Sequence, residues 1–156
     1  MKVIEASLPA AAGFAYIGLM PTPSSRRPKP VVLCILDGWG FRADPAPDNA
    51  IAQALVRAHQ RGVKVQVLLD EKSESTNRYV ISLFRSTGVP MRADGSHAIA
   101  HNKVMVIDQQ VLVTGSFNFT NSAETRNAEN LLILSGVSLA QAYRENWLSH
   151  WSHARP

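Results

Sequence analysis

His101-Asn-Lys-Val-Met-Val-Ile-Asp108 opens the stretch that decides the fold, and Gly115-Ser-Phe-Asn-Phe-Thr120 closes it. The alternating apolar residues predict two strands joined by a tight turn at residues 108–110. Side chains two positions apart share one face of a strand, so polar groups gather at one end of this hairpin. These polar residues are His101, Lys103, Ser116 and Asn118. Together their side chains can bind and attack a phosphate.

The composition indicates one globular domain with its own core, because the chain has 156 residues and 46% of them are hydrophobic. Sixteen Lys and Arg against twelve Asp and Glu leave a net charge of +4. That charge permits an anionic partner such as nucleic acid, and it fits an ordinary basic protein equally well. Cys34 is the single cysteine, so an intramolecular disulfide and a cysteine-based zinc cluster are excluded. No apolar run reaches the length of about 18 residues that a membrane-spanning helix needs.

Residues 1–30 are expected to form a poorly ordered arm and linker. Pro21 to Pro30 contains four prolines, which resist both helix and sheet. Residues 1–20 carry weak features of a secretion signal, interrupted by Glu5 and Pro9. The compartment therefore stays open: we favour the cytoplasm slightly over a periplasmic or secreted location.

Residues 31–156 are expected to form one α/β domain, a mixed and mostly parallel sheet flanked by helices. Residues 31–36 predict a buried strand, 51–61 a helix capped by Asp48 or Asn49, and 63–69 a second strand, which together make a βαβ unit. Further elements are predicted for the remaining chain. They are a helix through residues 79–84 closed by Gly88, an extended piece at 89–92, a strand at 131–134, and a last helix capped by Ser138. The stripe Tyr143, Trp147 and Trp151 on that last helix is read as core packing, with a dimer interface and base stacking as alternatives.

The pattern His-x-Lys-x-x-x-x-Asp followed by Gly-Ser-x-Asn resembles the phospholipase D superfamily, and above all its small bacterial Nuc-like endonuclease branch. The resemblance covers about residues 54–151 and includes Asn127-Ala-Glu-Asn130. It implies a phosphodiesterase that forms a phosphohistidine without any metal or other cofactor. The residues it assigns to catalysis are His101, Lys103, Ser116, Asn118 and Glu129. Of these, Lys103, Ser116 and Asn118 would bind the phosphate.

Two roles follow from the mechanism that the resemblance implies. His101 would attack phosphorus, and a second histidine would protonate the leaving oxygen. Since the chain has one such motif, the resemblance implies a homodimer with a shared site.

Asp108 is interpreted as a structural residue of the turn. The remaining histidines are interpreted as surface residues, with His97 the one to watch because it precedes the motif closely. They are His59, His97, His150 and His153.

The first part of the chain departs from the family. Residues 27–54 resemble the amino-terminal fragment of cofactor-independent phosphoglycerate mutase, in which the aspartate matching Asp37 is a manganese ligand. One carboxylate cannot hold such a metal alone, so Asp37 is interpreted as a strand-end residue. Residues 31–50 are atypical for the phospholipase D family, and we expect the family's first strand and helix to be missing.

The leading hypothesis is a non-specific, metal-independent endonuclease acting on DNA, with RNA as a further candidate substrate. A truncated, inactive relative that binds nucleic acid is the second hypothesis, and a phospholipid hydrolase of the phospholipase D type is the third. Mutase activity is not expected, because that family's serine nucleophile and remaining metal ligands have no counterparts here.

Overall fold

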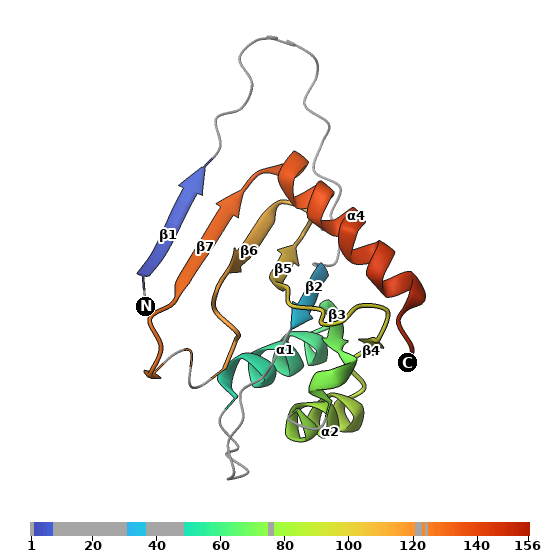
Figure 1. Ribbon diagram of the computed structural model, residues 1–156. Coiled ribbons are helices and arrows are strands. Elements are labelled where there is room, and N and C mark those ends of the chain that lie inside the picture. The colour runs from blue at the N-terminus through green and yellow to red at the C-terminus, as the bar shows by residue number, and fades with distance from the viewer. Residues whose placement is uncertain (1, 8–30, 37–48, 75–76, 121–122, 124) are drawn as a thin grey trace.

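The computed structural model describes residues 2–7, 31–36, 49–74, 77–120, 123 and 125–156. Its strands are β1 Lys2–Ser7, β2 Val31–Leu36, β3 Lys64–Asp70, β4 Met91–Asp94, β5 Lys103–Ile107, β6 Val111–Gly115 and β7 Asn130–Ser135. Its helices are α1 Ala50–Gln60, the short 3-10 helix η1 Glu71–Ser73, α2 Arg78–Thr87 and α4 Val137–His153. The strands form one sheet in the order β1-β7-β6-β5-β2-β3-β4 (Figure 1).

The predicted βαβ unit is confirmed. β2 and β3 pair in parallel, and α1 connects them. The side chain of Asn49 caps α1 by accepting the N–H of Ala52 at 2.9 Å. α2 ends at Gly88, whose left-handed backbone (φ +74°) is easiest for glycine to adopt. β2 lies inside the sheet, between β5 and β3.

Two expectations about the sheet need correction. The sheet is mixed as predicted, but it is not mostly parallel: three of its strand pairings are parallel and three are antiparallel. Lys2–Ser7 is not part of an arm, because it forms the edge strand β1 and pairs in parallel with β7. The sheet therefore does contain a strand from the start of the chain. Residues 8–30, including the proline-rich segment, and residues 37–48, including Asp37, lie outside the described part of the chain.

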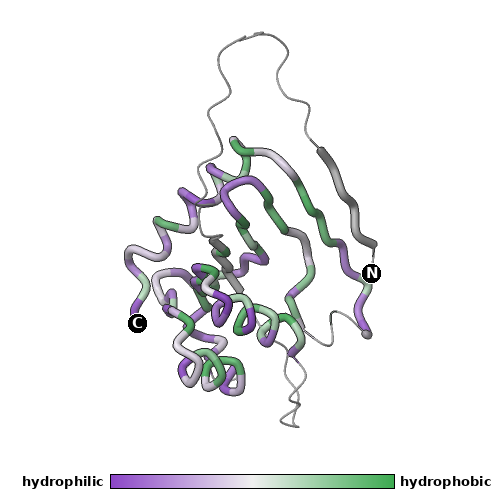
Figure 2. The backbone as a smooth tube through the Cα atoms, turned by 180° about the vertical axis from the view of Figure 1, so that it is seen from behind, coloured by the Kyte–Doolittle hydropathy of each residue, from purple (hydrophilic) through white to green (hydrophobic). Residues whose placement is uncertain are grey.

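Alternate residues of the central strands pack into two separate cores, one on each face of the sheet. Val67 of β3 and Met105 of β5 pack with α1 and α2, whereas their neighbours Leu68 and Val104 pack with α4. Because both faces are covered, the inner strands β5 and β6 carry mostly hydrophobic residues, which Figure 2 colours green. The molecule is a helix–sheet–helix sandwich, with helices flanking the sheet as predicted.

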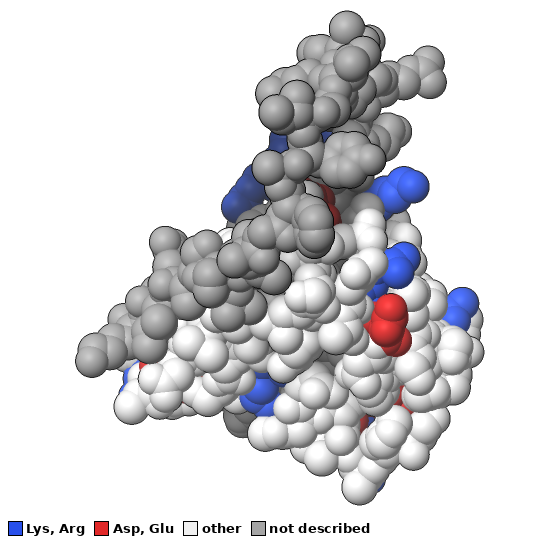
Figure 3. Space-filling view, turned by 90° about the horizontal axis from the view of Figure 1, so that it is seen from above, with Lys and Arg blue, Asp and Glu red and all other residues white. Residues whose placement is uncertain are grey.

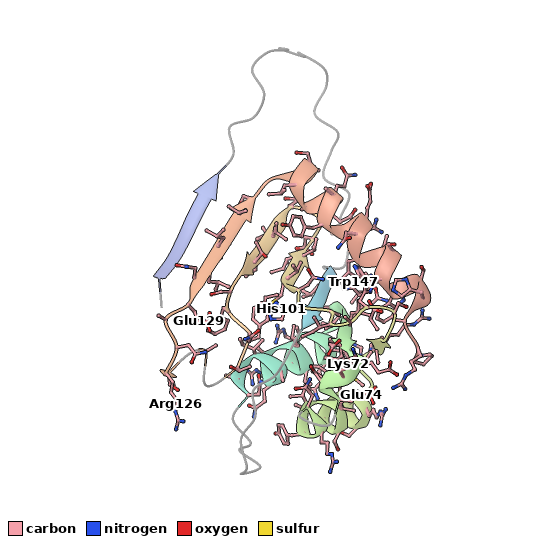
Figure 4. All side chains as sticks on the ribbon, viewed as in Figure 1. Lys72, Glu74, His101, Arg126, Glu129 and Trp147 are labelled. Atoms are coloured by element: carbon pink, nitrogen blue, oxygen red, sulfur yellow. The ribbon has the colours of Figure 1, made fainter. Side chains whose placement is uncertain are left out.

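Helix α4 packs on one face of the sheet through the predicted aromatic stripe. Trp147 is fully buried and stacks on Trp151, with ring centroids 4.7 Å apart, and Tyr143 packs against the same core (Figure 4). Core packing is therefore confirmed for this stripe. The predicted cap is wrong by two positions: the cap residue is Gly136, and Ser138 lies inside the first turn.

Candidate active site

The hairpin formed by β5 and β6 has the predicted form. β5 and β6 pair antiparallel, and the N–H of Gln110 donates to the oxygen of Ile107 at 3.0 Å across the turn. Asp108 and Gln109 both have positive φ, 54° and 58°, as the two central residues of a type I′ turn require. Asp108 thus lies in the turn at the far end of β5 from His101, which agrees with its predicted structural position.

The antiparallel order of three neighbouring strands gathers the predicted polar residues at one edge. β5 and β7 begin at the edge where β6 ends, since each pairs antiparallel with β6. Lys103 is the first residue of β5, Ser116 follows the last residue of β6, and Glu129 precedes the first residue of β7. Figure 4 shows His101 and Glu129 at this same end of the sheet.

Gly115 allows β6 to approach β7 closely at this edge. Its φ is +152°, and a Cβ atom built on it would lie 2.2 Å from the main-chain oxygen of Asn130. The N–H of Ser116 then donates to that same oxygen at 3.1 Å. A glycine is needed here because any side chain would push the two strands apart.

His101 and Lys103 differ sharply in their exposure. The side chain of His101 is exposed, whereas Lys103 is 6% exposed. The Lys103 ammonium group donates to the main-chain oxygen of His101 at 3.4 Å. A lysine is rarely buried to this extent unless its charge is compensated, and Glu129 supplies a nearby negative charge. The arrangement fixes a positive charge beside the main chain of an exposed histidine.

Ser116, Asn127 and Glu129 form a connected hydrogen-bond group. The Ser116 hydroxyl donates to one carboxylate oxygen of Glu129 and accepts the N–H of Asn130 at 3.1 Å. Asn127 donates to the other carboxylate oxygen at 2.9 Å. The Ser116 hydrogen bond, then the Asn127 hydrogen bond, and the charge of Lys103 hold the pKa of Glu129 below its ordinary value. Glu129 is therefore an anion at neutral pH.

Asn118 follows Ser116 at a spacing of two, within a well-packed loop. Phe117 and Phe119 on either side are 2% and 3% exposed and meet edge to face, with centroids 5.7 Å apart. Asn49, the cap of α1, donates to the main-chain oxygen of Phe119 at 3.3 Å. The Asn118 side-chain oxygen is buried and has no hydrogen-bond partner in the described structure. Because this oxygen only accepts hydrogen bonds, the NH₂ group of Asn118 is the part of the amide that could donate to a phosphate oxygen.

Sequence reasoning missed the residues that hold the loop before His101. Asp70, at the end of β3, is 1% exposed and accepts the N–H of Ala100 at 3.0 Å. Lys72 donates to the oxygen of Ala98 at 2.5 Å. The signal was present in the sequence, since Asp70 follows the apolar run Val67-Leu68-Leu69, but its partner Ala100 lies 30 positions away.

A second cluster was also missed. Asp94, fully buried at the end of β4, lies within 3.3 Å of three imidazoles. Burial alone would raise the pKa of Asp94, but the N–H of Ser96 and the imidazoles of His150 and His153 outweigh burial and hold it at about 2. His97 and His153 are exposed, as predicted for surface residues, and His150 is partly buried. Their convergence on one carboxylate was not predicted.

The family model for the cardiolipin synthase, phospholipase D-like domain matches residues 40–151. The chain belongs to the phospholipase D superfamily. The match spans both halves of the candidate site, from the loop before His101 to the strand after Glu129. The expected resemblance of about residues 54–151 is thereby confirmed and extended toward the amino terminus.

The relatives that this chain matches are named for different hydrolases. A phospholipase D from Rickettsia prowazekii is 41% identical over 102 residues, which cover 65% of this chain and 50% of that protein. A mitochondrial cardiolipin hydrolase from Xenopus tropicalis is 35% identical over 107 residues, covering 69% of this chain and 51% of that protein. The chain thus spans about half the length of these relatives.

The solved structure of another member of the superfamily matches most of this chain. The phospholipase D family member Nuc from Salmonella typhimurium superposes with a TM-score of 0.70 at 34% identity and covers 80% of each chain. The mixed α/β architecture described above is therefore the architecture of that family.

Proposed function

We propose that the chain is a metal-independent phosphodiester hydrolase that cleaves nucleic acid through a covalent intermediate on His101. The observation that supports it best is the gathering of an exposed imidazole, a buried ammonium group and the Ser116–Glu129 pair at one edge of the sheet. Each residue type matches one need of phosphodiester cleavage: a nucleophile, a fixed positive charge, and an anion to stabilise a charged imidazole.

His101 is the proposed nucleophile. Its neutral imidazole attacks phosphorus, a nitrogen–phosphorus bond forms, and the bond from phosphorus to the leaving oxygen breaks. A second imidazole, protonated at the start, gives its proton to that oxygen. The same imidazole then takes a proton from water, whose oxygen attacks phosphorus and displaces His101. Histidine suits both tasks because its pKa lies near neutrality.

Lys103 and Asn118 are the proposed phosphate ligands. The Lys103 charge stabilises the phosphoryl oxygens where negative charge accumulates, and its burial strengthens that interaction. Ser116 has a single hydroxyl hydrogen, which Glu129 accepts in this structure. Donation from Ser116 to a phosphate oxygen would therefore require this bond to open. Glu129, an anion at neutral pH, is suited to orient a protonated imidazole across the site.

The second imidazole is proposed to be His101 of a second copy of the chain. The sequence has five histidines. Three of them contact Asp94, and His59 belongs to α1. Because the other four lie outside the candidate site, a twofold homodimer is the simplest way to complete the pair.

Nucleic acid is the proposed substrate because the motif resembles the Nuc-like endonuclease branch, because Nuc matches 80% of this chain at 34% identity, and because the net charge of +4 suits a polyanion. The Lys and Arg side chains coloured on the face seen in Figure 3 are scattered rather than gathered in one basic patch. A phospholipid is the second candidate substrate, supported by relatives named phospholipase D and cardiolipin hydrolase. None of the described helices is long and apolar enough to cross a bilayer.

Incubation with plasmid DNA in EDTA tests the proposal. Wild type should cleave, His101→Ala should not, and His59→Ala should cleave as wild type does, with all three checked for folding and oligomeric state. Cleavage lost in EDTA and restored by manganese would contradict the mechanism. Cleavage of phosphatidylcholine or cardiolipin vesicles in place of DNA would assign the phospholipid substrate instead.

Co-expression of wild type with His101→Ala tests the shared site. Random pairing leaves only about a quarter of the dimers with two His101 side chains. Activity should therefore fall to about a quarter of the wild-type value. A fall to about a half would mean that each chain has an independent site.

A further inference from the structure

Four potential metal ligands converge at the carboxyl end of β4, outside the candidate active site. Asp94, His97, His150 and His153 each offer one ligand atom, and these atoms all lie within 4.8 Å of one another. The distances to the Asp94 carboxylate are 3.3 Å from His97 Nδ1, 2.7 Å from His150 Nδ1 and 3.2 Å from His153 Nε2.

The cluster is partly enclosed by the fold. The Asp94 side chain is fully buried and that of His150 is 15% exposed, whereas His97 and His153 are 48% and 35% exposed. An ion would thus rest on a buried carboxylate and still be reachable from solvent through the outer imidazoles. His150 and His153 are three positions apart in the last turn of α4, which places them on one face.

We propose that Asp94, His97, His150 and His153 bind a single Zn²⁺ ion. Three imidazoles and one carboxylate form a nitrogen-rich donor set that suits zinc and is unsuited to Mg²⁺ or Ca²⁺, which prefer oxygen ligands. The proposal is independent of the proposed nuclease function, since none of the four residues belongs to the site at His101.

The spacing of the donors agrees with a tetrahedral ion. With bonds of about 2.0–2.1 Å, neighbouring ligand atoms around zinc lie about 3.3 Å apart. The distance of 3.3 Å from Asp94 Oδ2 to His97 Nδ1 matches this edge, and His150 Nδ1 is closer to the same oxygen at 2.7 Å. His153 Nε2 lies 3.2 Å from the other carboxylate oxygen, Oδ1, and would turn toward an ion held by Oδ2. The imidazole nitrogens, at most 4.8 Å from one another, need only small side-chain rotations to close on one ion.

The ion would join two segments that are distant in sequence: the end of β4 with the loop directly after it, and the end of α4. These segments already meet through the main chain, because Ala93 and Arg155 exchange two hydrogen bonds of 2.7 Å and 3.0 Å. Arg92 also donates to the oxygen of Trp151 at 2.7 Å. The loop that begins at Gly95 leads to His101. A structural zinc ion at its start would therefore restrict the motion of the segment that carries the proposed nucleophile.

Zinc titration of the untagged, EDTA-stripped and desalted chain tests the proposal by calorimetry and thermal melting. One Zn²⁺ should bind per chain, and at about 100 times Kd the melting temperature should rise by roughly 5–11 °C. Co²⁺ should bind at the same site and show the intense visible absorption of tetrahedral coordination. Weak, pale octahedral Co²⁺, or Mg²⁺ producing the same rise, would overturn the assignment.

Three single variants locate the ion. His97→Gln and His153→Gln remove exposed ligands from a folded chain, and each should weaken zinc binding at least roughly 10-fold, because even the loss of an outer-shell partner costs that much. His59→Gln is the matched control and should bind zinc as wild type does. Equal binding by all three variants, or less than half an equivalent of zinc on the wild type, would refute the site whatever the DNA cleavage result.

Discussion

Replacing Gly115 by alanine should both destabilise the protein and disturb the proposed active site. The new Cβ atom would lie 2.2 Å from the main-chain oxygen of Asn130 and 3.2 Å from the Cα of Leu131. Both neighbours are backbone atoms of β7, so relief requires β6 and β7 to separate. That separation would break the Ser116 N–H bond to Asn130 and shift Ser116 relative to Glu129.

The expected loss of stability has two parts. A non-glycine residue with this φ costs about 1–3 kcal/mol, and loss of the hydrogen bond adds about 0.5–1.5 kcal/mol. The sum of about 1.5–4.5 kcal/mol corresponds to a fall in melting temperature of roughly 3–18 °C for a chain of this size. Thermal melting followed by circular dichroism measures it.

Gly88→Ala is the matched control. Gly88 also has a positive φ of +74°, but a Cβ atom there meets nothing within 4 Å. Its cost should be the backbone strain alone, about 1–2 kcal/mol, with DNA cleavage unchanged below the melting transition. Equal melting temperatures for the two variants, or full cleavage by folded Gly115→Ala, would refute the close approach of β6 to β7.

Three further outcomes are expected. Asn49→Ala should lose about 1 kcal/mol of stability through the α1 cap, measured by urea denaturation; no change would show that the cap contributes nothing. Trp147→Ala should lose about 3–5 kcal/mol because its side chain is fully buried, and a loss under 1 kcal/mol would contradict its packing. The pKa of Glu129 is lowered from 4.5 in the fold, so its stabilising effect is present above that value and lost as pH falls through the folded pKa. The stability difference between wild type and Glu129→Gln should therefore shrink between about pH 7 and pH 3. A difference that grows on acidification would contradict a lowered pKa of Glu129.

Much of the fold could be predicted from local patterns in the sequence. The hairpin, the βαβ unit and the aromatic stripe of α4 each follow from periodicity within one short window. The balance of parallel and antiparallel pairs could not be predicted, because it depends on strand order, and β5 and β7 lie far from their partners β2 and β1 in sequence. Lys2–Ser7 was missed because Glu5 and the small residues after it give a weak strand pattern.

The candidate site was predictable for the same reason, since His101, Lys103, Ser116 and Glu129 lie close together in the sequence and in a known pattern. The contacts that support it were not. Asp70 reaches Ala100 across 30 positions, and Asp94 meets His150 across 56. A lone aspartate after an apolar strand looks like a turn residue until its distant partners are placed beside it.

Detection of the covalent intermediate tests the central claim most directly. The chain is mixed with DNA in EDTA, quenched at alkaline pH to preserve phosphohistidine, digested and analysed by mass spectrometry. A nucleotide adduct should appear on the peptide that contains His101 and disappear in His101→Ala. Rapid DNA cleavage with the adduct on another residue, or with none on His101 even when turnover is trapped early, would contradict His101 as the nucleophile.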